Sequence, residues 1–525
     1  MCLKSIDIVI VAALLAAGCF DSSTGETGDS GSQNDLAPPT DLKARSEELS
    51  VALSWAHEIS AGAQFDVLRR MEGATEFAVV GQTDGARTYT DADPLLGRRY
   101  EYEVRARQGD AVSEPSISVS ASATREPADW TLIYFLASDG DYGYDYWFNV
   151  DGLEAQGGSS DKVNVLVLWD GFAQGDSRYL VVGDSDGTTS SFGVETAEGG
   201  EVNMGDVETY RAFVDWLLPR YTARRYMLSF HDHGDGAVST AWSGKGGVGP
   251  RAQDGDGKVA RNMLFDQTSA DSLDADEQAE IVAYVAEATS HKVDVVESMV
   301  CLGQMIENTF GMVGHAQYHV GPESLSYVTG TYPVSYLKQH PGADAEDVAR
   351  FLFSDHLAGV QRDGVPCHWS AIDLDAVPPL VDAMADMARA TSDALVAGLA
   401  PETVLDAAGK AQSYTYELGD LLSAYVDIED LARALTQPEM PQTVRTAAAA
   451  VIAAFDDGLV LENGFNNGTH PDTEISADYG NSHGLSVFHP NSRYPYYVAN
   501  AQPPYESLAF SEAASWADYL MDLTE

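Results

Sequence analysis

Tyr226-Met-Leu-Ser-Phe-His231-Asp-His233-Gly234 is an apolar run that ends in histidines, and Val293-Asp-Val-Val-Glu-Ser-Met-Val-Cys301-Leu-Gly303 is one that ends in a cysteine. Short apolar runs that end in glycine-rich turns are typical of interior strands in an α/β sheet, and the carboxyl ends of such strands carry chemistry. One stretch therefore has an imidazole at its end, and the other has a thiol. If the two strands are neighbours, they form a cysteine–histidine pair.

Strands and helices alternate around these two stretches. Buried strands are expected at 130–136 and 163–170, and a hairpin-like segment at 178–200. The pattern predicts an α/β fold with a mostly parallel sheet, flanking helices and a helical C-terminal part. The expected helices are 207–221, one that starts in the acid-rich stretch 271–277 and runs to about 290, 374–398, 402–412, 442–457 and 511–523.

Residues 37–123 follow a different pattern. Val51-Ala-Leu-Ser-Trp55 alternates apolar and polar residues, as does Tyr100-Glu-Tyr102-Glu-Val104-Arg-Ala106. Strands of about five residues between turn residues predict an all-β sandwich. With its early tryptophan, its Tyr-x-Tyr-x-Val-x-Ala strand and its Ser-x-Pro-Ser ending, the segment resembles a fibronectin type III domain. It contains no catalytic cluster, so we expect a spacer or adhesion module, joined by a linker (124–128) to a domain at 129–525.

The first 36 residues read as a targeting segment. A charged lead precedes an apolar run that is short for a membrane span and ends in Ala17-Gly18-Cys19. This ending resembles a bacterial lipobox, which implies that residues 1–18 are removed and that Cys19 carries lipid. The alternative is an ordinary secretory signal with an incidental cysteine. Residues 19–36 would be an acidic, flexible tether, and Phe20 favours the outer membrane or cell surface of the bacterial envelope.

The overall composition excludes one class of partner. The chain has 525 residues, of which 44% are hydrophobic and 10% aromatic, so most of it is expected to be globular. Acidic residues outnumber basic ones 81 to 30, which gives a formal net charge of −51. Because nucleic-acid phosphate repels such a surface, we expect no nucleic-acid partner.

The two strand ends suit nucleophilic catalysis. A free thiol is mostly protonated at neutral pH, and a neighbouring histidine activates it by taking the proton. His233 is the preferred base because Gly234 lets a substrate backbone approach, whereas His231 is expected to be a wall or an orienting partner. The backbone N–H groups of Gly234 and Cys301 are candidate donors to an oxyanion.

Other interpretations of these residues stay open. Cys301 could be an inert core residue or form a disulfide with Cys367. The pattern His-x-His-x-Asp also matches the start of a metallo-β-lactamase-type zinc site, but Gly236 stands where a further histidine is required, so we assign no metal ligands. Asp254-Gly-Asp256-Gly-Lys258 is similar to part of a calcium loop but lacks the remaining ligand positions. Calcium is the one cofactor that the sequence suggests.

Seven pieces of the segment 129–525 follow one another in a characteristic order: Trp130-Thr-Leu-Ile-Tyr-Phe, 163–170, the strand into His233, Phe265-Asp-Gln-Thr-Ser-Ala-Asp-Ser-Leu, the strand into Cys301, Ser370-Ala-Ile-Asp-Leu and Gly484-Leu-Ser-Val-Phe-His-Pro. With these pieces, residues 129–525 as a whole resemble clostripain-family cysteine peptidases, a caspase-like α/β group. The resemblance implies that His233 is the general base and acid, and that Cys301 is the nucleophile, which forms a thioester acyl-enzyme with protein or peptide substrates.

The chain departs from this family at the positions that determine substrate specificity. The family commonly has an aspartate two residues before the nucleophile, credited with binding an arginine or lysine, and Met299 stands there. A second pocket acid would fall near Thr329. Glu297 and Glu323 are acids at other positions that could compensate. We therefore expect no strict arginine specificity.

Two further expectations come from the resemblance. Members of the family are often activated by self-cleavage between the histidine and the cysteine, where 243–262 is the candidate loop. The alternative to an active enzyme is a surface binding or adhesion protein that keeps the peptidase fold without turnover.

Overall fold

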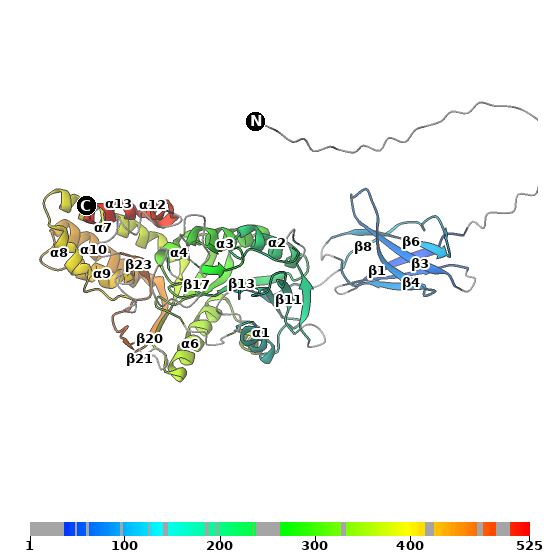
Figure 1. Cartoon of the computed structure of the whole chain (residues 1–525), viewed down its shortest axis with the longest axis horizontal. Coiled ribbons are helices and arrows are strands. Elements are labelled where there is room, and N and C mark those ends of the chain that lie inside the picture. Colours follow the sequence, from blue (N-terminus) through cyan, green and yellow to red (C-terminus); the bar gives the residue numbers. More distant parts are fainter. Residues whose placement is uncertain are drawn as a thin grey trace, which may run out of the picture. The chain divides into compact units, whose positions relative to one another are not determined.

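The computed structural model describes residues 36–47, 50–58, 62–94, 98–123, 126–139, 145–183, 188–194, 196, 199–234, 236–237, 263–326, 332–414, 425–469, 476–489 and 504–524. Cys19, Thr329 and the 243–262 loop with its candidate calcium ligands lie outside these ranges. The chain divides into two compact units, Met1–Thr124 and Arg125–Glu525 (Figure 1). No helix in the described ranges is long and apolar enough to cross a membrane.

The first unit is the expected β-sandwich. One sheet has the order β1-β2-β5 and the other β4-β3-β6-β7, with β8 also paired to β6. Along β6 every second side chain from Tyr100 to Ala106 is buried, so the inward faces of the strands build the core. Strand β1 was not predicted from the sequence, because it buries little beyond Leu42 and so lacks a clear apolar alternation. The strands are β1 (Thr40–Glu47), β2 (Ser50–Ala56), β3 (Gln64–Met71), β4 (Ala78–Asp84), β5 (Thr88–Asp91), β6 (Tyr100–Gln108), β7 (Ala111–Val112) and β8 (Val119–Ala121).

A nine-stranded sheet forms the centre of the second unit, in the order β12-β11-β10-β9-β13-β16-β17-β18-β20. Neighbours from β10 to β17 pair in parallel, and the strands beyond them on both sides pair antiparallel. The α/β fold is therefore confirmed, with a parallel centre inside a mixed sheet. The strands are β9 (Ala128–Ala137), β10 (Val163–Asp170), β11 (Arg178–Val181), β12 (Ser190–Gly193), β13 (Ala223–His231), β16 (Val293–Met299), β17 (Ala316–Gly321), β18 (Cys367–Asp373) and β20 (Val460–Asn466).

Helices cover both faces of this sheet (Figure 1). Side chains of β9 alternate between the two resulting cores: Leu132 and Tyr134 point to one, and Ile133 and Phe135 to the other. Because both faces are covered, the strand reads as a continuous apolar run. The first core is completed by α1 (Asp145–Ala155), α5 (Val334–Gln339) and α6 (Ala345–Asp363), and the second by α2 (Val207–Leu217), α3 (Ala275–Thr289) and α4 (Ile306–Gly311).

The C-terminal helices enlarge the second core. The expected single helix at 511–523 is wrong: Ser515 adopts a left-handed backbone (φ 48°), which separates α12 from α13. The segment after Gly484 lies outside the large sheet: β23 forms a two-stranded sheet with β19, and its Ser486 bridges to Met305. The remaining elements are β14 (Met263–Asp266), β15 (Asp271–Leu273), η1 (Leu374–Ala376), α7 (Val377–Val396), α8 (Pro401–Ala408), β19 (Tyr425–Asp427), α9 (Ile428–Leu435), α10 (Gln442–Ala454), η2 (Phe455–Leu459), β21 (Gly468–Thr469), β22 (Ser476–Ala477), β23 (Ser486–Phe488), η3 (Tyr505–Ser507), α12 (Ala509–Ala514) and α13 (Trp516–Thr524).

Candidate active site

The histidine and cysteine strands are direct neighbours. β13 pairs in parallel with β16, and His231 lies opposite Met299. His233 and Cys301 each follow two residues later, at the same edge of the sheet. A Cβ atom on Gly234 would lie 2.3 Å from the Cys301 carbonyl oxygen and 3.2 Å from its amide nitrogen. The segment that carries His233 therefore packs directly on the backbone of Cys301.

This contact changes the interpretation of Gly234. From the sequence, the absence of a side chain at Gly234 was interpreted as room for a substrate backbone. In the structure the backbone of Cys301 occupies the space that a side chain would need, so glycine is required by the fold itself. Gly234 also bridges to Met263 of β14, and the Phe265 N–H donates to Asp232 Oδ2 at 2.6 Å. Strand β14 thus holds the histidine segment from its other side.

A tight turn presents the thiol. After β16 ends at Met299, Leu302 takes a left-handed backbone (φ 57°), and a Cβ on Gly303 would lie 2.9 Å from the Ser298 carbonyl oxygen. Cys301 is left partly exposed, and His233 is exposed. The Ser326 N–H donates to Cys301 Sγ at 3.3 Å. Cys301 Sγ in turn donates to the Ser326 carbonyl oxygen at 3.7 Å, so the backbone of Ser326 holds the thiol on both sides of its peptide unit.

The structure does not join the two cysteines that it describes. Cys301 and Cys367 form no disulfide with each other in the described residues. Cys367 is fully buried in β18, where its Sγ donates to the Leu325 carbonyl oxygen at 3.3 Å and accepts from Ser324 Oγ at 3.5 Å. The disulfide alternative is thus absent from this structure, which leaves Cys301 as the accessible thiol of the two.

Comparison with known proteins decides the family. The model of the clostripain family matches residues 139–522, which is more than half of the chain. The chain belongs to the clostripain family. It is a cysteine peptidase of that family, with a caspase-like α/β fold.

Solved structures agree with this fold. An inactive zymogen C11 protease from Parabacteroides distasonis has a TM-score of 0.53 and 15% identity, and the match covers 74% of this chain and 99% of that one. A secreted C11 cysteine protease from Bacteroides thetaiotaomicron has a TM-score of 0.50 and 15% identity in complex with an irreversible peptide inhibitor, with the same coverage. No curated protein sequence gives a match.

Behind the active-site edge of this clostripain-family chain, a buried carboxylate links three elements. Glu297 of β16 is fully buried and accepts a hydrogen bond from Ser229 Oγ of β13. Nε2 of His356, on α6, lies 2.7 Å from Glu297 Oε1, and Nε2 of His231 lies 3.8 Å from Oε2. Burial alone would raise the pKa of Glu297, but the interactions with the two histidines outweigh burial and lower this pKa to about 2. His231 Nε2 lies 2.7 Å from Ser229 Oγ, so His231 contacts the carboxylate through this hydroxyl group inside the core.

The two acids that could replace the family's specificity aspartates both have internal partners. Glu297 interacts with His231 and His356, as described above. Glu323 is fully buried, with Nδ1 of His368 3.0 Å away, and it accepts from the Tyr414 hydroxyl at 2.7 Å. Met299 is 4% exposed and packs in an apolar core. Glu323 Oε1 has no hydrogen-bond partner among the described residues, but both carboxylates are fully buried and so are not exposed to a substrate guanidinium.

The structure contains a second buried acidic feature, which was not predicted from the sequence. Asp139 follows β9, Asp170 ends β10, and Asp266 ends β14, and all three are buried with their oxygens within 4.8 Å of one another. Burial and the neighbouring negative charges raise the pKa of Asp170 to about 8. The aspartates at the two strand ends were visible in the sequence, but nothing there indicated that Asp266 joins them.

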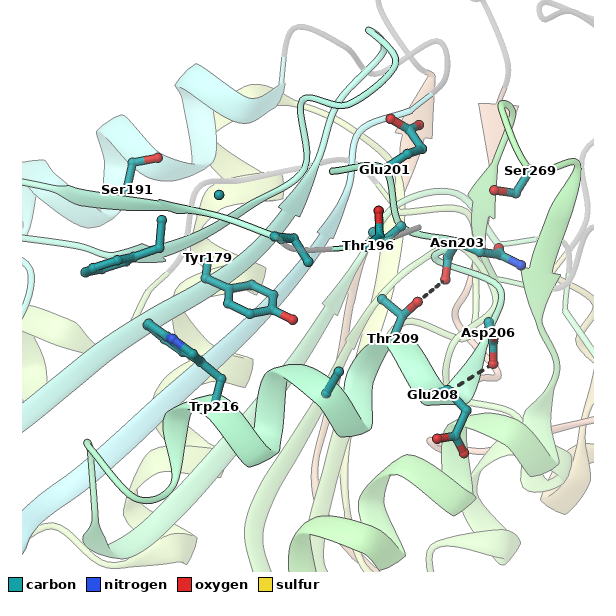
Figure 2. Close-up of a pocket in the computed structure, with 15 residues that line it drawn as sticks. Tyr179, Ser191, Thr196, Glu201, Asn203, Asp206, Glu208, Thr209, Trp216 and Ser269 are labelled. Carbon is teal, nitrogen blue, oxygen red and sulfur yellow. Dashed lines mark hydrogen bonds between the residues drawn. The ribbon is translucent and has the colours of Figure 1, made fainter. Parts of the chain in front are cut away.

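A pocket of about 1080 Å³ lies beside this acidic group. Tyr179 and Trp216 line one side of it, and Glu201, Asp206 and Glu208 line the other (Figure 2). Its walls come from β11, β12, α2 and the segment before α2, and no residue of 231–234 or 299–301 contributes. The pocket is therefore distinct from the predicted catalytic pair.

Proposed function

We propose that the chain hydrolyses peptide bonds through a dyad of His233 and Cys301. The observation that carries this proposal is the contact between Gly234 and the backbone of Cys301, at the carboxyl ends of two paired strands. It puts an exposed imidazole and a partly exposed thiol on neighbouring turns. Membership of a cysteine peptidase family supports the same assignment.

In the proposed reaction His233 removes the thiol proton and the Cys301 thiolate attacks the substrate carbonyl. The backbone N–H groups of Cys301 and Gly234 donate to the oxyanion. His233 then protonates the leaving amine, and the C–N bond breaks to leave a thioester on Cys301. Water, deprotonated by His233, hydrolyses this thioester and restores the thiol.

Thiol reactivity tests the dyad. At neutral pH we expect iodoacetamide to label Cys301 rapidly in the full chain, because the proposed base His233 takes the thiol proton. Replacing His233 by alanine should slow this labelling about ten-fold or more. Mass spectrometry of the labelled peptides is the measurement.

Cys367 serves as the internal control for this experiment, because it is buried and should react only on unfolding. Labelling that is equally fast in His233→Ala, or that falls on Cys367 in the folded protein, contradicts the proposed dyad.

We also propose that the residue before the cut is uncharged. A buried guanidinium without a carboxylate partner is costly to desolvate, and Met299, Glu297 and Glu323 provide no such partner. Apolar residues suit a pocket that contains Met299. Thr329, the position of the second family acid, is a further proposed pocket residue.

A matched set of fluorogenic peptides tests this specificity. Peptides that differ only in the residue before the cut should be cleaved with a kcat/KM at least about ten-fold higher for leucine or methionine than for arginine. The aminomethylcoumarin release rate is the measurement. A clear preference for arginine would overturn the assignment of an uncharged pocket.

We further propose an envelope location. Residues 1–18 are the signal, lipid on Cys19 anchors the chain to the membrane, and 19–36 is the tether. Residues 37–123 are a fibronectin type III-like spacer, and 124–128 link it to the peptidase domain at 129–525. The lipobox-like ending at Cys19 and the secreted relative from Bacteroides thetaiotaomicron support this arrangement. The net charge of −51 supports the exclusion of nucleic acid.

A further inference from the structure

The pocket beside α2 lies at one end of the large sheet, away from the catalytic pair. Among the described residues β12 is the last strand at this end, and β11, β10 and β9 separate it from β13. The pocket walls come from β11, β12, α2 and the segment before α2. Binding at this place therefore does not depend on whether the chain hydrolyses peptides.

One side of the pocket is an aromatic wall. The ring centre of Trp216 lies 5.1 Å from that of Tyr179 and 5.3 Å from that of Phe192, on the end strand β12. Phe192 is 40% exposed. An exposed ring beside partly buried rings is favourably covered by apolar or cationic side chains. Within the chain, the guanidinium carbon of Arg220 lies 5.2 Å from the centre of the Trp216 ring.

The other side of the pocket is acidic and has no basic counterpart. Glu201, Asp206 and Glu208 line it, and none of the described lining residues is a lysine, an arginine or a histidine (Figure 2). Glu208 pairs with Arg211. Asp206 instead accepts from the Glu208 N–H at 3.0 Å and so caps α2. No basic side chain in the described ranges forms an ion pair with Glu201 or Asp206, so the pocket has charge left to attract a cationic group.

Glu201 also has an oxygen that no described group satisfies. Its Oε2 accepts from the Gly175 N–H, whereas Oε1 is buried without a donor, in a residue that is 6% exposed. Burial raises the pKa of Glu201, and the nearby charges of Asp139 and Asp176 raise it further. Because buried carboxylate oxygens are normally satisfied, this one points to a donor that enters the pocket, and a cationic donor also offsets the negative charge.

We propose that this pocket binds a basic peptide segment of another protein in an extended conformation. Its lysine or arginine side chains face Glu201 and Asp206, and its apolar side chains cover Phe192. A strand at the end of a sheet accepts a further peptide strand, whose successive side chains point to opposite faces. A free polyamine shares the positive charge, but it has neither a backbone to pair with β12 nor an apolar side chain.

Fluorescence anisotropy of a labelled peptide tests the site. The full chain carries Cys301→Ala, so that the proposed dyad cannot cut the probe. A peptide of alternating leucine and arginine should bind saturably at about 50 mM NaCl. Replacing every arginine by citrulline, which has a similar shape but no charge, should weaken binding about ten-fold or more.

Three results of this titration overturn the inference. The first is no binding of the arginine peptide up to about 100 μM of the chain. The second is equal binding of the citrulline peptide, because recognition would then not involve charge. The third is displacement of the arginine peptide by an equal concentration of spermidine, because the site would then select for amines and not for a peptide.

Variants of the same chain locate the site. Asp206→Asn removes a charge but keeps a good N-cap for α2, and together with Glu201→Gln it should weaken peptide binding about ten-fold. Phe192→Ala shortens an exposed side chain and should weaken binding about three-fold or more. The matched control is Glu402→Gln with Asp406→Asn, two exposed acids on α8, which should leave binding unchanged.

These variants separate the pocket from general attraction to an acidic chain. Unchanged binding in both pocket variants overturns the inference. An equal loss in the α8 control also overturns it, because the net charge of −51 would then account for the binding.

Discussion

Replacing Cys301 by alanine is expected to lower kcat/KM for peptide hydrolysis by about ten-thousand-fold or more. The substitution removes the atom that forms the acyl-enzyme, and other site groups then supply only residual catalysis. Stability should change little, because Cys301 lies partly exposed on a turn. Peptide cleavage and the Tm of the same preparations are the measurements.

Cys367→Ala is the matched control for this loss. Its thiol is buried in β18 and contacts Leu325 and Ser324, so its removal should lower stability modestly and leave kcat/KM per folded molecule almost unchanged. A Cys301→Ala variant that keeps wild-type kcat/KM would show that the nucleophile lies elsewhere. A Cys367→Ala variant that folds but has no activity would contradict the assignment of the nucleophile to Cys301.

Replacing Glu297 by glutamine is expected to lower the free energy of unfolding of the second unit by about 3 kcal/mol at pH 7. The change removes the charge that faces His231 and His356 while keeping the side chain's size. The network joins β13, β16 and α6, so its loss weakens the packing behind both strand ends. Urea unfolding is the measurement, with the exposed Glu287→Gln as control.

The pH dependence has a definite sign. The network lowers the pKa of Glu297 from 4.5 to about 2, so its stabilisation is present above pH 4.5 and is lost as the pH falls toward 2. The stability difference between wild type and Glu297→Gln should therefore shrink from pH 7 to pH 3. An equal difference at both pH values would contradict the assigned ionisation of Glu297.

Much of this architecture was predictable from the sequence because its signals are local. Continuous apolar runs indicated β13 and β16, and alternation indicated β6. The acid-rich stretch 271–277 indicated a helix start, and α3 begins within it, where the side chains of Asp274 and Glu277 cap the helix reciprocally. Placing His233 and Cys301 at strand ends required only these local patterns, whereas pairing them rested on a family resemblance.

By itself, the sequence determined most of the strands and helices around the candidate site, and that a thiol and an imidazole follow two of the strands. Only the tertiary structure decided which distant groups meet. In the folded chain Glu297 faces two histidines, and Asp266 lies close to Asp139 and Asp170. The backbone of Cys301 packs against Gly234. The physical reason is that periodicity reports burial along one segment, while compensation of a buried charge depends on side chains from other elements.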